Sequence, residues 1–482
     1  MNTDQAERER QLREFLDQLP LVTLRVLGRK AGVAQPAGCN KDQLVDTIIL
    51  LATGKMTPAV RSGRGAPPKT IFLDPEVVAR FDRLVGALKA ETNELSVASP
   101  EPVHDVLYSD SVYRGILEIT QGGYGFLRAK NCQPSSTGAD VFIAAPAIHS
   151  LRLREGDLVT CTARPRQKND SAAMDELLTV NGLPVGRYEQ RPQFDSLTAK
   201  YPCEKIALSE GCGELSLRVL DLFVPIGKGQ RALIIAPPKA GKTTLLKNIA
   251  KAVAAHHDDI HLIVLLIDER PEEVTDFRSS VEGAEVIYST FDEGADHHVR
   301  AAELTIAHAK RLAEQGKDVV ILLDSLTKLT RAYNYIAEST GKTLTGGLDA
   351  GALSEPKRFF GAARNTVEGG SITILSTVLV DTGSRMDDVI YEEFKGTGNA
   401  DIFLSRDLAE RRIFPAIDIR RSGTRKEELL LTKDELSAVY KMRERGLVEN
   451  AVGLFDMMKR TEDNSEFVTR LPDWMKVFKN NV

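Results

Sequence analysis

The spacing of apolar residues along the chain changes its character twice. Up to about residue 55, apolar residues recur at helical spacing, at Leu12, Phe15, Leu16 and Leu19 and again at Leu44, Val45, Ile48, Ile49 and Leu51. From residue 112, short runs separated by turn residues predict strands, and from about residue 217 longer apolar runs alternate with helical patterns. We therefore expect several domains of different structural classes.

The leading helical pattern predicts a small helical domain over residues 1–56, with Asn40 as the N-cap of its later helix. Residues 57–69 are rich in proline and glycine and poor in apolar residues, which is typical of a linker. A short helical pattern follows at 74–90. Residues 57–110 are accordingly interpreted as a linker that contains a short helical segment.

The next segment is typical of a small β-barrel. Strands are predicted at 113–119, 124–128, 141–144, 158–163 and 177–180. Five short strands with intervening turns favour a five-stranded OB-fold, which we place at 111–183 and follow with a connector at 184–216.

The remainder of the chain, 217–482, is predicted to be an α/β domain. Its strands are nearly continuous apolar runs, at 232–235, 262–267, 319–323 and 372–380. Helical periodicity at 301–315 separates two of these runs. Strands that alternate with helices in this way predict a mostly parallel sheet.

Composition limits the class of protein. A chain of 482 residues with 42% hydrophobic and 27% charged residues is typical of a soluble, multidomain protein. Because no apolar run could span a bilayer and the first residues are charged, we expect a cytoplasmic protein without a membrane partner. The five scattered cysteines form no CxxC pair and indicate neither a zinc site nor a disulfide framework. The net charge of −5 argues against a protein that coats nucleic acid indiscriminately.

A candidate phosphate-binding loop follows the strand at 232–235. The sequence Ala236-Pro237-Pro238-Lys239-Ala240-Gly241-Lys242-Thr243 precedes a helical pattern at 244–255, which is the context of a Walker A motif, although Ala236 replaces the usual first glycine. Backbone N–H groups and the helix N-terminus would bind the phosphates of ATP, Lys242 would contact the β and γ phosphates, and Thr243 would bind Mg²⁺. The alternative is an ordinary Gly-Lys-Thr turn.

Two other strands end in carboxylates. Asp324 ends the run 319–323 and resembles a Walker B acid that would lie near Mg²⁺. Glu269 follows the run 262–267, and its carboxylate could orient or deprotonate an attacking water. The alternative for Glu269 is a surface ion pair with Arg270.

Longer motifs resemble those of a known family. They are IIAPPKAGKTTLLKNIA, LLIDERPEEVTD, STFDEGADHHV, ILLDSLTKLTRAYN, GKTLTGGLDAGAL, PKRFFGAARN, DTGSRMDDVIYEEFKGTGN and FPAIDIRRSGTRKEELL. The chain is thereby similar to the transcription termination factor Rho family, almost continuously over 217–432 and more loosely through the barrel. The resemblance implies a RecA-like P-loop ATPase domain that assembles as a homohexameric ring, with ATP bound between neighbouring subunits.

The resemblance also implies roles for individual residues of the nucleotide site. Pro238, Lys239, Ala240, Gly241, Lys242, Thr243 and Thr244 correspond to the phosphate loop, and Phe414 corresponds to the aromatic that stacks on adenine. Arg412 and Arg406 could be second cationic groups at the interface that Arg425 serves. Glu269 corresponds to the catalytic carboxylate and Asp324 to the Walker B acid. Arg425 corresponds to the arginine finger that a neighbouring subunit supplies; considered alone, it belongs only to a basic loop.

The predicted barrel carries a candidate RNA-binding face. Tyr124 and Phe126 alternate along a strand and therefore share one face, and Arg128 could meet phosphate or stack on a base. The family resemblance adds Asp140 and Phe142 as base contacts; a third aromatic expected near Met174 is absent. The alternative is a barrel whose aromatics pack inward.

Two further segments resemble the RNA-binding loops of the family's central channel. Lys342, Thr343 and Gly346 belong to the segment similar to the Q loop. Arg385 belongs to the segment similar to the R loop, at a position where the family commonly has lysine. Considered alone, both segments could be flexible connectors.

The predicted function is that of an RNA-dependent ATPase that terminates transcription. As the family resemblance implies, it would move 5′→3′ along single-stranded RNA as a translocase or helicase, with ATP and Mg²⁺ as cofactors, and would release the transcript from RNA polymerase and its elongation factors. Two alternatives remain open. A rotary or export ATPase would hydrolyse ATP regardless of RNA, and a passive RNA-binding protein would not need Glu269.

Overall fold

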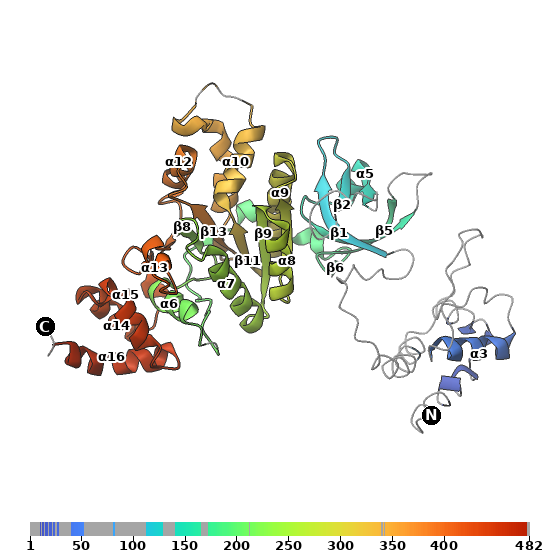
Figure 1. The fold of residues 1–482 in the computed structure, drawn as a ribbon. Helices are drawn as coiled ribbons and strands as arrows, with labels where there is room; N and C mark the ends of the chain where they lie inside the picture. Colours follow the sequence, from blue (N-terminus) through green and yellow to red (C-terminus); the bar gives the residue numbers. More distant parts are fainter. Residues whose placement is uncertain are drawn as a thin grey trace. The chain divides into compact units, whose positions relative to one another are not determined.

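The computed structural model describes residues 10, 12–13, 15–17, 19–21, 23–24, 27, 40–52, 81, 112–128, 140–164, 172–211, 213–338, 341 and 343–479 (Figure 1). The chain forms two compact units, residues 1–106 and 107–482, and each is considered by itself. The expected linker at 57–110 lies outside the described residues, apart from Phe81, and so does Lys342.

The first unit is a small helical cluster. Its helix α3 (Lys41–Ala52) begins after Asn40, whose Oδ1 accepts a hydrogen bond from the backbone N–H of Gln43 at 2.9 Å. The predicted N-cap is therefore confirmed. The apolar residues that recur at helical spacing form one core, which consists of Leu12, Phe15, Leu16, Leu24, Leu27, Leu44, Val45, Ile48, Ile49, Leu51 and Phe81.

The second unit begins with a barrel. Its strands are β1 (Val112–Ile119), β2 (Gly125–Arg128), β3 (Val141–Ile143), β4 (Leu158–Arg164), β5 (Ala173–Val180) and the short β6 (Leu183–Pro184), with α5 (Ala145–Ser150) after β3. They follow the order β3-β2-β1-β4-β5-β6, and β3 also pairs with β5, which closes the barrel. The predicted five-stranded OB-fold is confirmed, while β6 and the earlier start of β5 were not anticipated.

Buried ion pairs join the barrel to the domain that follows. Arg191 binds Asp157 through two hydrogen bonds of 2.6 Å, and its Nε lies 3.6 Å from Oε2 of Glu314. Glu314 also accepts a hydrogen bond from the backbone N–H of Phe194 at 2.8 Å. The elements between the two domains are η3 (Tyr188–Gln190), η4 (Phe194–Ser196) and β7 (Ala199–Lys200). Because these charges are buried and paired, separating the barrel from the next domain would leave them without partners.

A largely parallel sheet forms the centre of the following domain. Its strands are β8 (Arg231–Ala236), β9 (Ile260–Glu269), β10 (Glu285–Thr290), β11 (Asp318–Asp324), β12 (Arg364–Thr366), β13 (Ser371–Leu379), β14 (Ala400–Phe403) and β15 (Gly423–Thr424). The main order is β10-β9-β11-β13-β8-β14-β15, with β12 and β7 added beside β13. Only the pairings that involve β15, β12 and β7 are antiparallel. The predicted parallel α/β domain is confirmed.

Helices cover both faces of this sheet. They are α6 (Leu215–Phe223), α7 (Lys242–His256), α8 (Pro271–Ser280), α9 (Ala295–Ala313), α10 (Leu326–Ile336), α11 (Ser354–Gly361), α12 (Arg385–Phe394) and α13 (Arg406–Glu410), with short η5 (Thr345–Gly347), η6 (Ala350–Leu353) and η7 (Glu427–Leu429). Helix α9 begins six residues before the predicted 301–315. The first turn of α9 was not predicted because its residues are mostly polar, although His298 and Val299 are buried.

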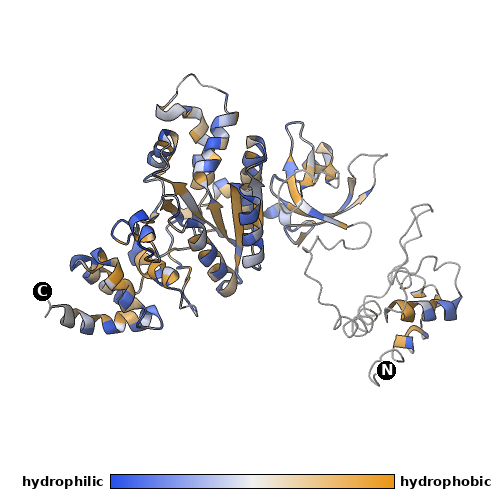
Figure 2. Ribbon diagram, in the orientation of Figure 1, coloured by the Kyte–Doolittle hydropathy of each residue, from blue (hydrophilic) through white to orange (hydrophobic). Residues whose placement is uncertain are grey.

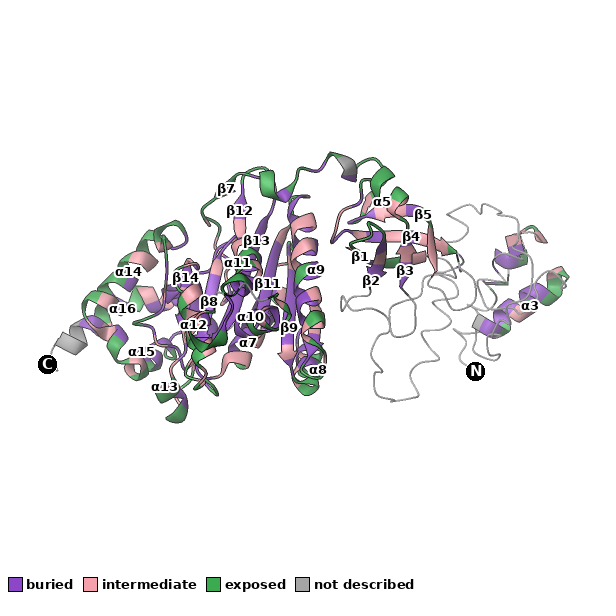
Figure 3. Ribbon diagram, turned by 90° about the horizontal axis from the view of Figure 1, so that it is seen from above, coloured by how far each residue is buried: buried purple, intermediate pink, exposed green. Residues whose placement is uncertain are grey.

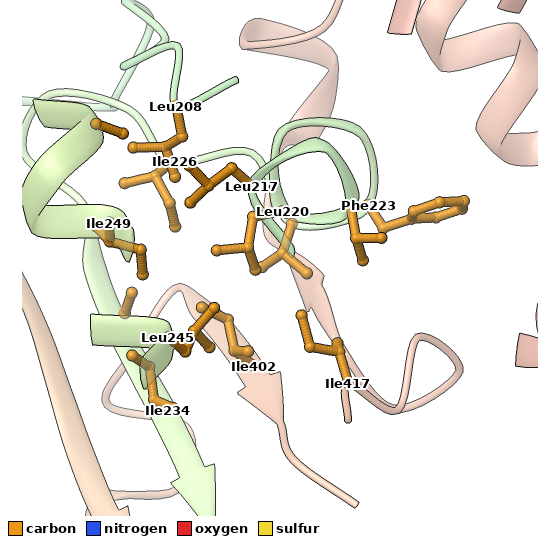
Figure 4. Packing of buried hydrophobic residues seen from close by; sticks show 14 of the residues in the cluster. Leu208, Leu217, Leu220, Phe223, Ile226, Ile234, Leu245, Ile249, Ile402 and Ile417 are labelled. Carbon is orange, nitrogen blue, oxygen red and sulfur yellow. The ribbon is translucent and has the colours of Figure 1, made fainter. Parts of the chain in front are cut away.

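The strands read as continuous apolar runs because each is buried on two sides. Ile234 of β8 packs with α6 and α7, whereas its neighbours Leu233 and Ile235 belong to the core beneath α9 and α10. Figure 2 shows the sheet strands as hydrophobic, and Figure 3 shows them as buried. Figure 4 shows Leu217 and Leu220 of α6 close to the side chains of α7, β8 and β14. Two-sided burial removes the alternation of an exposed sheet.

The chain ends in a group of helices, α14 (Lys433–Glu444), η8 (Leu447–Glu449), α15 (Ala451–Met458) and α16 (Asn464–Lys479). The buried guanidinium of Arg218, on α6, donates hydrogen bonds to the carbonyl oxygens of Met458, Thr461 and Asp463 at 2.7–2.8 Å. This contact ties the group to the sheet domain. None of the described helices has the length and apolar character needed to cross a bilayer.

Candidate functional site

The phosphate loop lies where the motif predicts, between β8 and α7. Gly241 has φ +88° and stands at the N-cap of α7, and Lys239 has φ +64°. Left-handed residues within such a loop turn successive N–H groups toward one point, in front of the helix N-terminus. This arrangement suits an anionic phosphate group.

Lys242 brings the two predicted carboxylates together. Its Nζ lies 2.5 Å from Oδ1 of Asp324 and 3.3 Å from Oε1 of Glu269. Burial alone would lower the pKa of Lys242, but the adjacent carboxylates outweigh burial and the pKa is raised. The ammonium is therefore charged at neutral pH, as a phosphate ligand must be.

Glu269 is buried, with 5% of its surface exposed, and is not a surface residue paired with Arg270. Besides Lys242 it contacts Nζ of Lys328 at 2.8 Å. Burial would raise the pKa of Glu269, but the two ammonium groups outweigh it and hold the pKa below its usual value. Glu269 is thus ionised at neutral pH, which suits a group that orients water by accepting a hydrogen bond.

Asp324 offers an oxygen suited to a cation. Its Oδ1 accepts a hydrogen bond from Oγ1 of Thr377 at 2.8 Å, whereas its Oδ2 is buried and has no hydrogen-bond partner within the part of the chain that the structure describes. A buried carboxylate oxygen without a donor is costly unless a cation or water satisfies it. Asp324 and Thr243, at the start of α7, therefore fit the oxygen ligands of Mg²⁺.

A pocket of about 530 Å³ adjoins the phosphate loop. Gly241 and Thr244 line one side of it, and Phe414 and Ile417 another. Phe414 is 49% exposed, so its ring is accessible to a flat base. Arg412 is exposed at the turn after α13, two residues before Phe414. The size, the aromatic wall and the adjoining loop fit a purine nucleotide.

Arg425 lies near the amino ends of the parallel strands, whereas the phosphate loop lies at their carboxyl ends. Ala400 of β14 pairs with Ala232 of β8 and with Thr424 of β15. The loop begins after Ala236, four residues and about 13 Å farther along β8. Arg425 itself is exposed, and its N–H donates to Asn399 at 2.8 Å. One arginine side chain cannot cover that distance, so Arg425 cannot reach the phosphate loop of the same chain.

The barrel presents three aromatic rings in one group. The ring centroids of Tyr124, Phe126 and Phe142 lie 5.6–5.9 Å from one another, and Tyr124 is 40% exposed. The rings thus do not simply pack inward. Met174 packs against the barrel core instead of extending this group.

Arg128 and Asp140, both predicted to contact RNA, bind each other in the structure. Arg128 is only 8% exposed, and its guanidinium forms ion pairs with Glu118 and Asp140 while lying 4.8 Å from the centre of the Phe126 ring. Asp140 is also buried. Their contacts with RNA remain predictions. Their position beneath Phe126 supports a role in holding that ring in place, a distinction that required the burial of both side chains to be known.

The two candidate loops lie against each other. A Cβ atom on Gly346 would approach the backbone N of Met386 to 2.7 Å, so the segment that contains Thr343 packs directly on the start of α12. Arg385, at that start, is exposed. Thr382 donates to the buried carboxylate of Asp387 at 2.7 Å, and Arg331 of α10 binds the same carboxylate. The segments are therefore supported, rather than being free connectors.

Two residues of the site were not predicted from the sequence. Lys328 contacts Glu269 and also donates to the backbone oxygen of Asp268 at 2.6 Å, and Thr377 holds Asp324 from β13. The only signal for Lys328 was its place in the first helical turn after Asp324. Nothing in the local sequence distinguishes Thr377 from other buried strand residues.

Comparison with known proteins gives consistent matches. A family described as "Rho termination factor, RNA-binding domain" matches residues 113–185, and the "ATP synthase alpha/beta family, nucleotide-binding domain" matches residues 216–424. Transcription termination factor Rho of Bacillus subtilis is 52% identical over 357 residues, which cover 73% of this chain and 83% of that protein. Those of Aquifex aeolicus and Escherichia coli K12 are 51% and 50% identical, covering 74% and 73% of this chain and 83% and 86% of theirs.

Proposed function

The chain belongs to the transcription termination factor Rho family, and from this membership we infer that it terminates transcription by hydrolysing ATP on RNA. The family resemblance of the motifs is thereby confirmed. The chain is an ATP-hydrolysing enzyme with an RNA-binding domain. The observation that carries the proposal is the contact of Lys242 with both Asp324 and Glu269, in one chain with an exposed group of aromatic rings.

We assign the chemistry to this chain's own residues as follows. The phosphate loop and Lys242 hold the triphosphate, and the pocket beside Phe414 holds adenine. Glu269, kept ionised by its lysine partners, orients the water that attacks the γ-phosphorus. Thr243 and Asp324 would hold Mg²⁺, which when bound neutralises phosphate charge.

A homohexameric ring completes the site. Because Arg425 lies far from the phosphate loop of its own subunit, it is suited to reach the γ-phosphate of a neighbouring one. A guanidinium there would stabilise the charge of the transferring phosphoryl group, so hydrolysis would require a subunit contact. Such a contact would allow the subunits of the ring to hydrolyse ATP one after another.

Single-stranded RNA is the proposed track. The barrel rings would hold the transcript by stacking, and Thr343, Gly346, Arg385 and Lys342 would follow it through the ring in the 5′→3′ direction. Motion along the nascent transcript in the cytoplasm would bring the ring to RNA polymerase and its elongation factors. The direct test is ATP turnover with and without single-stranded RNA: strong stimulation that Lys242→Ala abolishes supports the proposal, and equal turnover without RNA rejects it.

Stacking on the barrel makes a separate prediction. Tyr124→Ala removes one exposed ring, so the affinity for single-stranded RNA should fall about five- to 150-fold, which corresponds to roughly 1–3 kcal/mol for one stacked base. Fluorescence anisotropy at a fixed salt concentration measures this affinity. Tyr440→Ala is the matched control, because Tyr440 is 51% exposed on α14, away from the barrel. Equal affinities of the two variants would contradict the prediction.

Helix α10 connects the hydrolysis site with the RNA loops. It begins two residues after Asp324, the hydroxyl of Thr327 accepts a hydrogen bond from Leu379, and Arg331 binds Asp387 at 2.5 and 2.8 Å. Asp387 in turn holds Thr382. A shift at the nucleotide can therefore reach the loop before Arg385 through a single rigid helix.

Thr382→Val tests this connection. It removes the hydrogen bond to Asp387, worth about 1 kcal/mol, together with the longer one accepted from the backbone N–H of Ser384 at 3.2 Å. Because valine nearly preserves the side-chain volume, we expect RNA-stimulated turnover to fall about fivefold. Steady-state ATPase assays with saturating RNA measure the effect. Thr469→Val is the control, since the Thr469 hydroxyl binds only within α16. Unchanged stimulation in Thr382→Val would separate the loop from the coupling.

A further inference from the structure

Three side chains from different elements converge away from the nucleotide site. They are His261 on β9, Glu285 on β10 and His308 on α9, and one ligating atom of each lies within 4.8 Å of the others. Nε2 of His261 is 2.9 Å, and Nε2 of His308 is 3.9 Å, from Oε2 of Glu285. Two neighbouring strands and a helix that packs on them thus bring two imidazoles close to one carboxylate.

The hydrogen bond of His308 determines which of its nitrogens faces the group. Its Nδ1 lies 2.9 Å from the carbonyl oxygen of Gly156, and a carbonyl can only accept. Nδ1 therefore carries the proton, and Nε2 directs a lone pair toward Glu285. A backbone carbonyl that orients the second nitrogen in this way is the usual support of a metal-ligating histidine.

The two separations from Glu285 suit a small tetrahedral ion. Zn–N and Zn–O bonds of about 2.0–2.2 Å place tetrahedral ligands about 3.4 Å apart. The two separations from Glu285 lie half an ångström on either side of that value. The side chain of His261 is 37% exposed, so an ion can enter and water can occupy a fourth position.

We propose that His261, Glu285 and His308 bind one Zn²⁺-type divalent ion. Two neutral imidazoles and a carboxylate are the ligands that such borderline ions prefer over Mg²⁺ or Ca²⁺. None of these three ligands is a cysteine, so the spacing of the cysteines in the sequence could not reveal this site.

The location assigns the ion a bracing role. His261 stands at the start of β9 and Glu269 at its end, eight residues or about 26 Å away. The ion is therefore remote from ATP. Gly156, which His308 contacts, belongs to the turn before β4 of the barrel, and a Cβ there would collide with the backbone of α9 at 2.3 Å. Bound metal would tie β9, β10 and α9 together at the joint with the barrel.

Zinc titration of the full chain, after removal of metal with a chelator, tests the proposal. In competition with a chromogenic chelator we expect one equivalent of Zn²⁺ to bind and to raise the melting temperature. His261→Gln should weaken binding by more than about tenfold and abolish the thermal shift. His297→Gln is the matched control, because the His297 side chain is 38% exposed on the same helix as His308 but lies outside the cluster. It should behave as the natural chain does.

A second variant and a second metal guard against misfolding and binding to thiols. Glu285→Gln preserves the side-chain shape and should also weaken Zn²⁺ binding. Co²⁺ should give a tetrahedral spectrum without sulfur charge-transfer bands. The proposal is overturned if the natural chain binds no Zn²⁺, if His261→Gln binds it equally well, or if sulfur bands show that cysteines hold the ion.

Discussion

Mixing two inactive variants, Lys242→Ala and Arg425→Ala, is expected to restore ATP hydrolysis that neither shows alone. Lys242 lies in the phosphate loop at the carboxyl ends of the parallel strands, whereas Arg425 lies near their amino ends and is proposed to act on the nucleotide of a neighbouring subunit. In rings assembled from both variants, an Arg425→Ala subunit supplies an intact loop and an adjacent Lys242→Ala subunit supplies an intact arginine. Up to about a quarter of the subunit contacts are then complete.

The expected loss in each single variant is large. Removal of an arginine finger reduces turnover by about 10³-fold or more, so even partial recovery in mixed rings is easily measured. The two variants are mixed under conditions that dissociate their rings, allowed to reassemble and assayed for ATP hydrolysis with RNA. Arg420→Ala is the control, because Arg420 is exposed in the same basic loop and paired with Asp418. An Arg425→Ala variant with normal turnover, or mixed rings without recovery, would remove the basis for a shared site.

Glu269→Gln should reduce kcat by about 10²- to 10⁴-fold, the usual contribution of a positioned acid–base group. The amide keeps the shape of the side chain but cannot accept the proton of water as a carboxylate does. ATP should still bind, because the phosphate loop and the pocket beside Phe414 are unchanged. Single-turnover hydrolysis and binding of a fluorescent ATP analogue measure the two effects separately.

Glu272→Gln provides the comparison for Glu269. Glu272 is exposed in the first turn of α8, three residues farther along, so its replacement should leave kcat unchanged. Loss of ATP binding in Glu269→Gln, in place of slow hydrolysis, would show that the carboxylate organises Lys242 and Lys328 and does not act on water.

Local patterns were sufficient for the architecture. Continuous apolar runs predicted β8, β9, β11 and β13 because two-sided burial leaves no polar positions, and short runs with turns predicted the barrel. The loop from Ala236 to Thr243 was recognisable because binding phosphate requires a contiguous backbone. The polar first turn of α9 and the short β6 escaped, since neither has an apolar period.

Contacts between distant segments were beyond the reach of such patterns. Arg128 has the sequence context of a surface cation, yet Glu118 and Asp140 enclose it. Lys328 and Thr377 join the site from separate elements, and His261, Glu285 and His308 meet only because β9, β10 and α9 are neighbours. Each of these depends on residues far apart in the chain.

By itself, the sequence determined the classes of the domains, the phosphate loop and the family, because each is written in residues that are close together or in long motifs. Only the tertiary structure decided which charges are buried and paired. It also decided that Arg425 and Lys242 of one chain lie at opposite ends of the parallel strands. The physical reason is that burial and distance arise from strand order and packing, which bring together residues that no local pattern relates.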